Sequence, residues 1–174
     1  FCTTVTPLEK AETTLRLIQT QGYERVIIFC NTKHMCQRLC DDFQRAGLDC
    51  DCIHGDIRQK QRERAMQNYR EGKLAILIAT DVASRGIDVD DVECVINYDI
   101  PEENEYYVHR IGRTGRAKRK GVAWSMVSNF PEKAKLDEIC KFCNFTIKPM
   151  TLSAEGVLEE EIVKAPPAPK RKYR

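Results

Sequence analysis

Apolar stretches of two kinds alternate along the 174-residue chain. Where β-branched and aromatic residues follow one another they predict strands, and where apolar residues recur every third or fourth position they predict helices. The predicted strands cover residues 1–5, 25–30, 51–54, 75–80, 93–98 and 121–128. Because residues 25–30 (RVIIFC) and 75–80 (AILIAT) are apolar along almost their whole length, they favour strands buried on both faces of a parallel sheet.

Helices are predicted between these strands. The first begins at residues 6–9 (TPLE), where Thr6 is the N-cap, a proline follows and Glu9 completes a capping box. Its apolar face is predicted to run from Leu8 to Ile18, and the last helix is predicted to turn Phe142 inward. The predicted helices after the first cover residues 33–46, 58–70, 102–113 and 131–143.

Strands and helices that alternate at these intervals predict an α/β fold, with a mostly parallel sheet and helices on both faces. In such folds, ligands bind at the loops that leave the carboxyl ends of the strands. Three such loops follow core strands, at residues 31–33, 81–88 and 99–116. The pattern fades after Met150, so we expect one domain over residues 1–150 and an extension over 151–174. The end of that extension, VKAPPAPKRKYR, is proline-rich and then basic, which predicts a solvated tail.

Composition narrows the class of protein. A hydrophobic fraction of 42% and a charged fraction of 31% fit a soluble globular domain, and no run approaches the roughly 18 apolar residues of a membrane span. The net charge of +2 does not indicate a nucleic-acid binder, but basic residues cluster at 58–64, 110–120 and 170–174, and local patches attract phosphate. A start at Phe1, without a secretory signal, predicts a piece of a longer cytoplasmic protein.

The nine cysteines do not form a disulfide pattern, because their number is odd and their spacing irregular. Cys140 and Cys143 have the spacing of half a zinc ribbon. A zinc site needs a second matching pair, and the pairs 36/40 and 50/52 have the wrong spacing for one. We therefore predict reduced, mostly buried thiols and no metal.

The strongest functional signal is the stretch 109–116 (HRIGRTGR), in which three arginines recur every third residue with glycines between them. Glycine lowers helix propensity and allows a ligand to approach the backbone closely. Arginine is always charged, and its rigid guanidinium group matches the geometry of phosphate oxygens. This stretch therefore predicts a phosphate-binding loop rather than a solvated basic surface.

Two further stretches carry weaker signals. Residues 79–88 (ATDVASRGID) leave a core strand through a turn of small and hydrogen-bonding residues, where Thr80 could present a hydroxyl group to a sugar-phosphate chain. Taken alone, Thr80 is better explained as a strand-end cap. Asp88 has the acceptor oxygens that a ribose needs. Gln59 and Arg62 lie in the first turn of a predicted helix, where free amides and the helix dipole favour anions, although charged helices are common.

Taken in order, residues 26–32 (VIIFCNT), the pair Gln59 and Arg62, residues 79–88 and residues 109–116 resemble motifs IV, IVa, V and VI of the DEAD-box RNA helicases. The resemblance covers residues 1–150 in the order and spacing of the family, and its bacterial members are the most similar. It implies a RecA-like three-layer α/β/α sandwich, the second of two such domains.

The resemblance also implies roles for matching residues. Arg113 and Arg116 would be catalytic arginine fingers that reach the γ-phosphate of ATP, and Gly86 and Asp88 would meet the ribose. His109 and Arg110 would brace the contact between the two domains. The residues expected to bind RNA, largely without reading its bases, are Thr32, Gln59, Arg62, Thr80, Asp81 and Arg85.

Other motifs of this family are absent from the sequence. It has no Gly-x-x-x-x-Gly-Lys-Thr loop, Asp-Glu-Ala-Asp or Ser-Ala-Thr, so ATP and Mg²⁺ would be held mainly by the N-terminal RecA-like domain. We therefore expect the chain alone to be an inactive monomer, and the joined protein to be an RNA-stimulated ATPase that unwinds short duplexes. The alternatives are a related DNA helicase and a non-enzymatic RNA-binding module.

Overall fold

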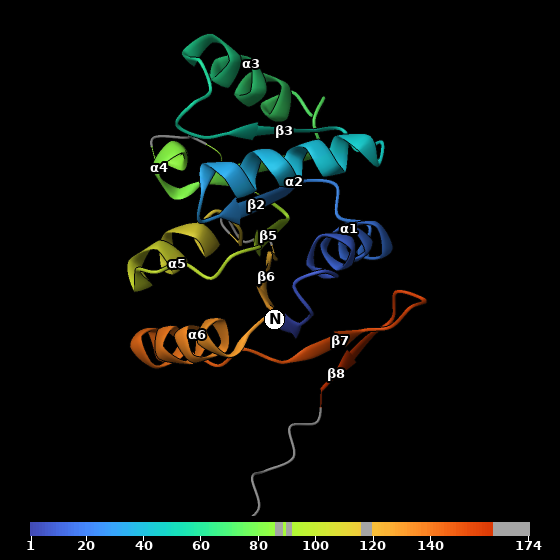
Figure 1. Cartoon of the computed structure of the whole chain (residues 1–174), viewed down its shortest axis with the longest axis vertical. Coiled ribbons are helices and arrows are strands. Elements are labelled where there is room, and N and C mark those ends of the chain that lie inside the picture. Colours follow the sequence, from blue (N-terminus) through green and yellow to red (C-terminus); the bar gives the residue numbers. More distant parts are fainter. Residues whose placement is uncertain (86–88, 90–91, 116–119, 162–174) are drawn as a thin grey trace, which may run out of the picture.

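A computed structural model describes residues 1–85, 89, 92–115 and 120–161. Six parallel strands form its central sheet in the order β1-β6-β5-β2-β4-β3 (Figure 1). The predicted parallel α/β fold is therefore confirmed. The strands of this sheet are β1 (Cys2–Thr4), β2 (Val26–Cys30), β3 (Cys50–Ile53), β4 (Ile76–Thr80), β5 (Cys94–Asn97) and β6 (Val122–Val127).

Six helices lie in the described part of the chain, and they cover both faces of the sheet. Side chains of β2 alternate between the two faces: Ile28 packs in one core cluster with α1 and α2, and Phe29 packs in another with α3 and α4. A third cluster joins α5 and α6 to β1 and β6. The helices are α1 (Lys10–Gln21), α2 (Lys33–Arg45), α3 (Gln59–Arg70), α4 (Asp81–Ser84), α5 (Asn104–Ile111) and α6 (Phe130–Cys143).

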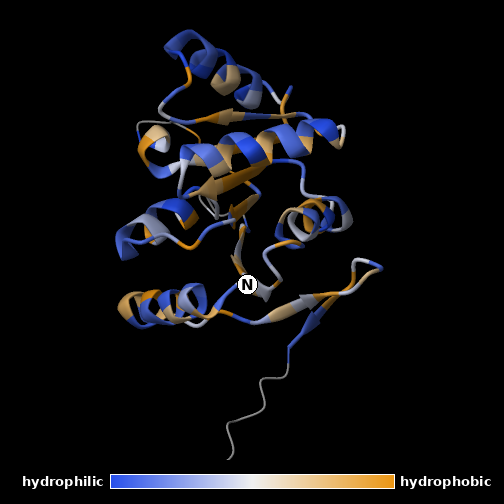
Figure 2. Cartoon of the chain, viewed as in Figure 1, coloured by the Kyte–Doolittle hydropathy of each residue, from blue (hydrophilic) through white to orange (hydrophobic). Residues whose placement is uncertain are grey.

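The distribution of apolar residues explains this arrangement. All five residues of β2 and all five of β4 are buried, as expected for strands with helices on both sides. Figure 2 shows the ribbon of β2 in hydrophobic colours, whereas α2 and α3 carry mixed colours because only one side of each helix is buried. None of the described helices is long and apolar enough to cross a membrane.

Local capping signals set the helix ends. The Thr32 hydroxyl accepts a hydrogen bond from the backbone N–H of Met35 (3.1 Å), and Asn129 caps α6 in the same way through Glu132 (2.8 Å). Such caps satisfy N–H groups that have no partner within the helix. The helix that follows Thr6 begins later than predicted, at Lys10, and Glu9 is its N-cap residue.

Leu8 and Phe142, which the sequence predicts to be buried, are exposed instead. Thr6 and Glu9 do bond to each other, from hydroxyl to carboxylate (2.6 Å) and from N–H to hydroxyl (3.3 Å), but they close a turn ahead of the helix. The turn leaves Leu8 95% exposed, and the buried side of α1 runs from Lys10 through Leu17 to Ile18. Phe142 is 57% exposed, because the inner side of α6 is carried by Leu136 and Ile139.

A hairpin that the sequence pattern does not predict follows the sheet. It consists of the antiparallel strands β7 (Met150–Leu152) and β8 (Leu158–Glu160). Pro149 forms a bridge with Cys2, and Leu152 joins the core cluster that contains α1 and α2. The extension therefore packs against the core through Leu152, while the predicted tail at 163–174 lies outside the described residues.

Candidate functional site

The carboxyl ends of β2, β4 and β5 bring polar residues to one edge of the sheet. β2 lies between the other two, with Cys30 opposite Thr80 of β4 and Phe29 opposite Asn97 of β5. Asn31, Asp81 and Asp99 follow these strands within one or two residues. The register therefore sets three loops side by side where ligands bind in sheets of this kind.

Arg110 joins these loops from α5. Its Nε donates to Asp81 Oδ1 (2.7 Å), and its Nη2 donates to Asp81 Oδ2 (2.6 Å) and to Asn31 Oδ1 (2.9 Å). Its Nη1 donates to the backbone oxygen of Asp99 (2.7 Å) and to Asn97 Oδ1 (3.3 Å). A guanidinium group has five N–H donors, and each of the five has an acceptor here.

Arg110, which was predicted from the sequence to brace a contact with a second domain, is buried within this one. The residue is 1% exposed, and its guanidinium carbon lies 5.3 Å from the centre of the Phe29 ring. A buried arginine stays charged, so it needs the Asp81 carboxylate as a partner. Its guanidinium group therefore braces the loops of its own domain.

The braced cluster extends toward α1 and α6. Asp99 Oδ2 accepts from the N–H of Asn31 (2.9 Å), and its Oδ1 lies 3.6 Å from the Lys10 ammonium group. Lys10 also bonds to Glu132 (3.1 Å) and is 5% exposed. This buried network makes the loops parts of one rigid unit, because satisfied buried polar groups restrict one another.

Tyr107 anchors the same helix on its other side. Its hydroxyl shares a buried hydrogen bond with Ser125 Oγ of β6 (2.9 Å), and its ring stacks on Phe145. Burial raises the pKa of Tyr107 to about 12, so the hydroxyl group keeps its proton at neutral pH. α5 is thus fixed to β6 by Tyr107 and to the loops at the sheet edge by Arg110.

Arg113 lies just beyond the end of α5. Its N–H donates to the Arg110 oxygen (3.2 Å), and its own oxygen accepts from the N–H of Val92 (3.2 Å). Arg113 is half-buried, while His109 is exposed. Together with Asp81, Ser84, Tyr106 and other residues of the site they line a cavity of about 60 Å³. The predicted residues Gly86, Asp88 and Arg116 lie outside the described residues.

Arg62 and Arg85 meet at the start of α3 and the end of α4. Arg62 Nη2 donates to the backbone oxygen of Ala83 (2.5 Å) and, more weakly, to that of Arg85 (3.4 Å). The guanidinium group of Arg85 stacks over the Tyr106 ring at 5.2 Å and donates to the Tyr106 hydroxyl. The structure therefore brings together two of the arginines predicted to bind RNA.

The other residues predicted to bind RNA have structural roles or lie near by. The hydroxyl group of Thr32 caps α2, and the carboxylate of Asp81 is held by Arg110. Thr80 is 7% exposed and lies at the N-cap position of α4, but its side chain makes no capping bond. Gln59 is exposed in the first turn of α3 and bonds to Glu63 (2.9 Å).

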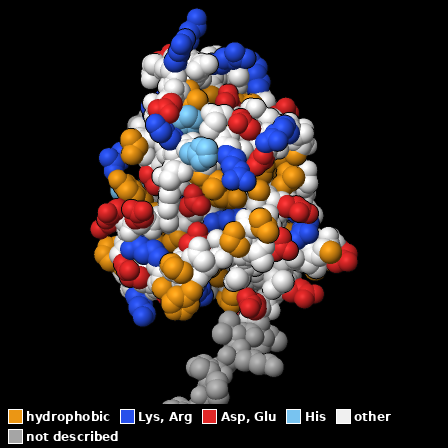
Figure 3. All heavy atoms as spheres, viewed as in Figure 1, with side chains coloured by type: hydrophobic (Ala, Val, Ile, Leu, Met, Phe, Trp, Pro, Cys, Tyr) orange, Lys and Arg blue, Asp and Glu red, His pale blue; other side chains and the backbone are white. Residues whose placement is uncertain are grey.

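Four residues of the site have no role predicted from the sequence: Asn31, Asn97, Asp99 and Tyr106. The sequence does contain a signal for Asn97, because it places an amide side chain in an otherwise apolar strand, where the structure buries it fully. A buried polar side chain must have a partner, so its presence in that stretch already indicates a buried network. On the face drawn in Figure 3, acidic and basic side chains are interspersed, so no basic patch dominates that face.

Comparison with known proteins agrees with the geometry. Residues 9–118 match the family described as the helicase conserved C-terminal domain. The ATP-dependent RNA helicase RhlB of Shewanella sediminis is 40% identical over 166 residues, which are 95% of this chain and 37% of that protein. The chain thus spans little more than a third of the length of this relative.

Solved structures share the fold. The E. coli DEAD-box protein SrmB, bound to regulator of ribonuclease activity A, is 32% identical with a TM-score of 0.81, covering 95% of both chains. A structure of S. cerevisiae Dbp5 bound to RNA and ADP BeF3 is 33% identical, with a TM-score of 0.77 over 85% of this chain and 40% of that one. The sheet and its helices therefore have the RecA-like arrangement of C-terminal domains in such proteins.

Proposed function

Because the chain belongs to the helicase conserved C-terminal domain family, in its DEAD-box branch, we propose that it is the second motor domain of an ATP-dependent RNA helicase. In this proposal it supplies half of an ATP site and half of an RNA groove, and an N-terminal RecA-like domain supplies the rest. The observation that carries the proposal is the buried Arg110, which fixes the loop bearing Arg113 against the loops that follow β2, β4 and β5.

The size of the cavity supports a site divided between two domains. Pockets that enclose a drug-sized ligand measure about 300–1,000 Å³, whereas the cavity beside Arg113 and His109 measures about 60 Å³. As formed by the described residues, this cavity is too small to enclose ATP. A second domain would form the other wall, and ATP with its Mg²⁺ would be held mainly there.

The roles proposed for the residues of the ATP half follow from their charge and from the resemblance to the DEAD-box motifs. Arg113 and Arg116 would stabilise the charge that develops on the γ-phosphate, which arginine fingers do with gains of about 10³–10⁵ in rate. Gly86 and Asp88 would contact the ribose, and His109, which is exposed beside Arg113, would meet the other domain.

The RNA half would lie along the first turn of α3 and the loop after β4. Gln59, Arg62, Thr80 and Arg85 would contact sugar and phosphate groups, so binding would depend little on base sequence. Contacts to 2′-hydroxyl groups would favour RNA over DNA. In support, Arg62 already contacts the backbone of the loop that carries Arg85. Thr32 and Asp81 would shape the groove from beneath, since their side chains are held within the fold.

In the working cycle that we propose, ATP and RNA together favour a closed arrangement of the two domains. Closure would bring Arg113 and Arg116 to the γ-phosphate and bend the bound strand, which would release its partner from a short duplex. Hydrolysis and loss of phosphate would then reopen the cleft. We place this activity in the cytoplasm and expect the separate chain to be a monomer.

The test compares ATP hydrolysis, with and without RNA, by this chain and by the chain joined to an N-terminal RecA-like domain. We expect no turnover from the chain alone and RNA-stimulated turnover from the joined protein. Arg113→Ala in the joined protein should lower kcat by about 10³-fold or more with an unchanged circular dichroism spectrum. Normal turnover in that variant would contradict the proposed role of Arg113.

Two outcomes would indicate the alternative functions. Stimulation of the joined protein by DNA as strongly as by RNA would indicate a DNA helicase. RNA binding without any ATP turnover in the joined protein would indicate a non-enzymatic RNA-binding module.

A further inference from the structure

Four cysteines that are unrelated to the site described above face one another between α2 and β3. Cys36 and Cys40 lie four residues apart on α2, and Cys50 and Cys52 lie two residues apart on β3. Four helical residues span about 6 Å and two strand residues about 6.6 Å, so the two pairs have matching separations. The pairs that seemed wrongly spaced for zinc along the sequence are therefore well matched once helix and strand pack together.

Hydrogen bonds show how the two pairs are aligned. Cys36 Sγ donates to the Ile53 oxygen at 3.8 Å, and Cys50 Sγ donates to the Cys40 oxygen at 3.7 Å. The helix thus runs opposite to the strand, with Cys36 near the end of β3 and Cys40 near its beginning. All four residues are buried, with at most 5% of each exposed.

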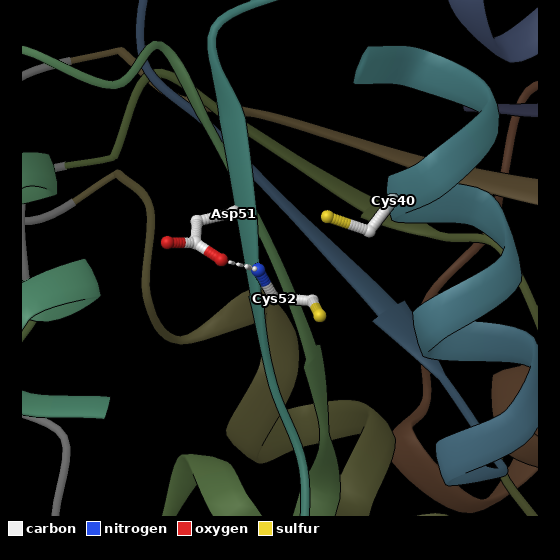
Figure 4. Close-up of side chains that lie close together, drawn as sticks. All are labelled: Cys40, Asp51 and Cys52. Atoms are coloured by element: carbon white, nitrogen blue, oxygen red, sulfur yellow. Dashed lines mark hydrogen bonds between the residues drawn. The ribbon is translucent and has the colours of Figure 1, made fainter. Parts of the chain in front are cut away.

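The central pair of sulfurs is already close. Cys40 Sγ and Cys52 Sγ lie within 4.8 Å of each other, and Figure 4 shows both in the space between the strand and the helix. Zinc–sulfur bonds of about 2.3 Å in a tetrahedron put sulfurs about 3.8 Å apart. This pair therefore needs to approach by no more than about 1 Å to meet that spacing.

Asp51 also has a carboxylate oxygen within 4.8 Å of these two sulfurs, but it is poorly directed for binding a metal between the helix and the strand. Side chains alternate along a strand, so Asp51 leaves β3 on the opposite face from Cys52. Figure 4 shows its carboxylate on the side of the strand away from Cys40, where it accepts from the N–H of Cys52 at 2.8 Å. The thiols of Cys36 and Cys50 each contact a backbone oxygen of the facing element, so they also lie between α2 and β3. Neither sulfur is within 4.8 Å of both Cys40 Sγ and Cys52 Sγ, so both side chains would have to turn toward that pair to complete a site.

We propose that Cys36, Cys40, Cys50 and Cys52 form a buried tetrathiolate site for Zn²⁺ that links α2 to β3. Binding would replace four thiol protons by one Zn²⁺, and the protons would pass to the solvent buffer. Thiolate sulfur is a soft ligand that selects zinc over magnesium or calcium, and a closed set of four cysteines is typical of a structural zinc site. Such a site would stabilise the helix and strand without taking part in catalysis.

The test measures metal in the full chain, expressed in zinc-supplemented medium and purified under reducing conditions without chelator. We expect one Zn²⁺ per chain by native mass spectrometry and elemental analysis. Exchange for Co²⁺ should give the intense visible spectrum of tetrahedral thiolate coordination. Addition of Zn²⁺ to the metal-free chain should raise Tm, whereas Mg²⁺ should not.

Matched double variants locate the site. Cys40→Ala with Cys52→Ala should lose at least nine-tenths of the bound zinc, and Cys140→Ala with Cys143→Ala, which removes the pair on α6, should keep all of it. Because the first variant removes two buried side chains and is expected to be less stable, the Co²⁺ spectrum of the wild-type chain provides a second readout: it should indicate four sulfur ligands. A folded, reduced wild-type chain without zinc would overturn the proposal, as would loss of zinc only in the Cys140/Cys143 variant.

Discussion

Replacing Asp81 by Asn tests whether the buried ion pair holds the site together. The substitution preserves shape, but it leaves the guanidinium group of Arg110 without its counter-charge at 1% exposure. Asn offers one oxygen in place of two, so one of the two donors at 2.6 and 2.7 Å also loses its acceptor. Breaking a buried ion pair by removing one partner costs about 3–5 kcal/mol. Because a domain of this size is stable by about 5–15 kcal/mol, Asp81→Asn should remove a large part of the stability.

Urea denaturation followed by circular dichroism measures this loss as a change in the free energy of unfolding. The matched control is Asp56→Asn, since Asp56 forms an ion pair with Lys33 at a similar distance of 3.0 Å, but both side chains are more than 60% exposed. An exposed pair contributes about 0–1 kcal/mol, so the control should change stability little. If the two variants lost the same small amount, below about 1 kcal/mol, the reasoning about burial would be refuted.

Two other predictions concern the hairpin and the thiols. Gly156→Ala should lower the free energy of unfolding by about 1–3 kcal/mol, because Gly156 has a φ of +82° and an added Cβ would lie 2.3 Å from Thr20 Cγ2. Gly55→Ala, where an added Cβ meets nothing within 4 Å, is its control in thermal unfolding, and equal losses would contradict the packing of the hairpin on α1. When the native chain is labelled with a maleimide and analysed by mass spectrometry, Cys140 and Cys143 should react first. The other seven thiols are buried, and burial raises the pKa of Cys30 and Cys94. Rapid labelling of Cys94 in the folded chain would show that the β5 core opens.

The sheet could be predicted because its signal is local. β2 and β4 are apolar along almost their whole length and buried throughout, a pattern typical of strands covered on both faces. The start of α1 could not be placed by the same means. The residues of the predicted capping box do bond to each other, but the chain uses them to close a turn, and the helix begins only where Lys10 can reach Asp99 and Glu132. That choice depends on contacts across the fold.

The hairpin after Met150 escaped prediction for a related reason. Each of its strands has three residues, too few to show an alternating pattern. Its stability depends on the bridge from Pro149 to Cys2 and on the burial of Leu152 against residues far away in the chain. The cysteine pairs on α2 and β3 are a second case, since their matching separations become visible only when helix and strand pack together.

The structure brings the three predicted loops together at one edge of the sheet, but the sequence could not distinguish the structural roles of the arginines. Regular spacing makes Arg110 and Arg113 look equivalent. In the structure the helix ends at Ile111, so Arg110 points into the domain from its last turn while Arg113 belongs to the loop beyond. Burial of Arg110 requires acceptors from residues 31, 81, 97 and 99, and their convergence is a property of the sheet register.

This division of tasks predicts that Arg110 cannot be replaced by another cation. Arg110→Lys retains the positive charge, but an ammonium group has three donors and no planar fork, so at least two of the five acceptors would lose their bond. Unsatisfied buried acceptors cost about 1–3 kcal/mol each. We therefore expect a loss of several kcal/mol in urea denaturation.

The same substitution separates bracing from catalysis. In the protein joined to its N-terminal domain, Arg110→Lys should also lower RNA-stimulated ATP turnover, because the loop that carries Arg113 would no longer be fixed against the loops after β2, β4 and β5. Lowering the temperature until the variant is fully folded should leave part of that defect, since the loop stays loosely held even in the folded domain. If turnover returned to the wild-type value once the variant was folded, Arg110 would be needed for stability alone. If the Arg110→Lys variant were as stable as the wild type, the positive charge alone would hold the loops in place, and the five hydrogen bonds of the guanidinium group would not be needed.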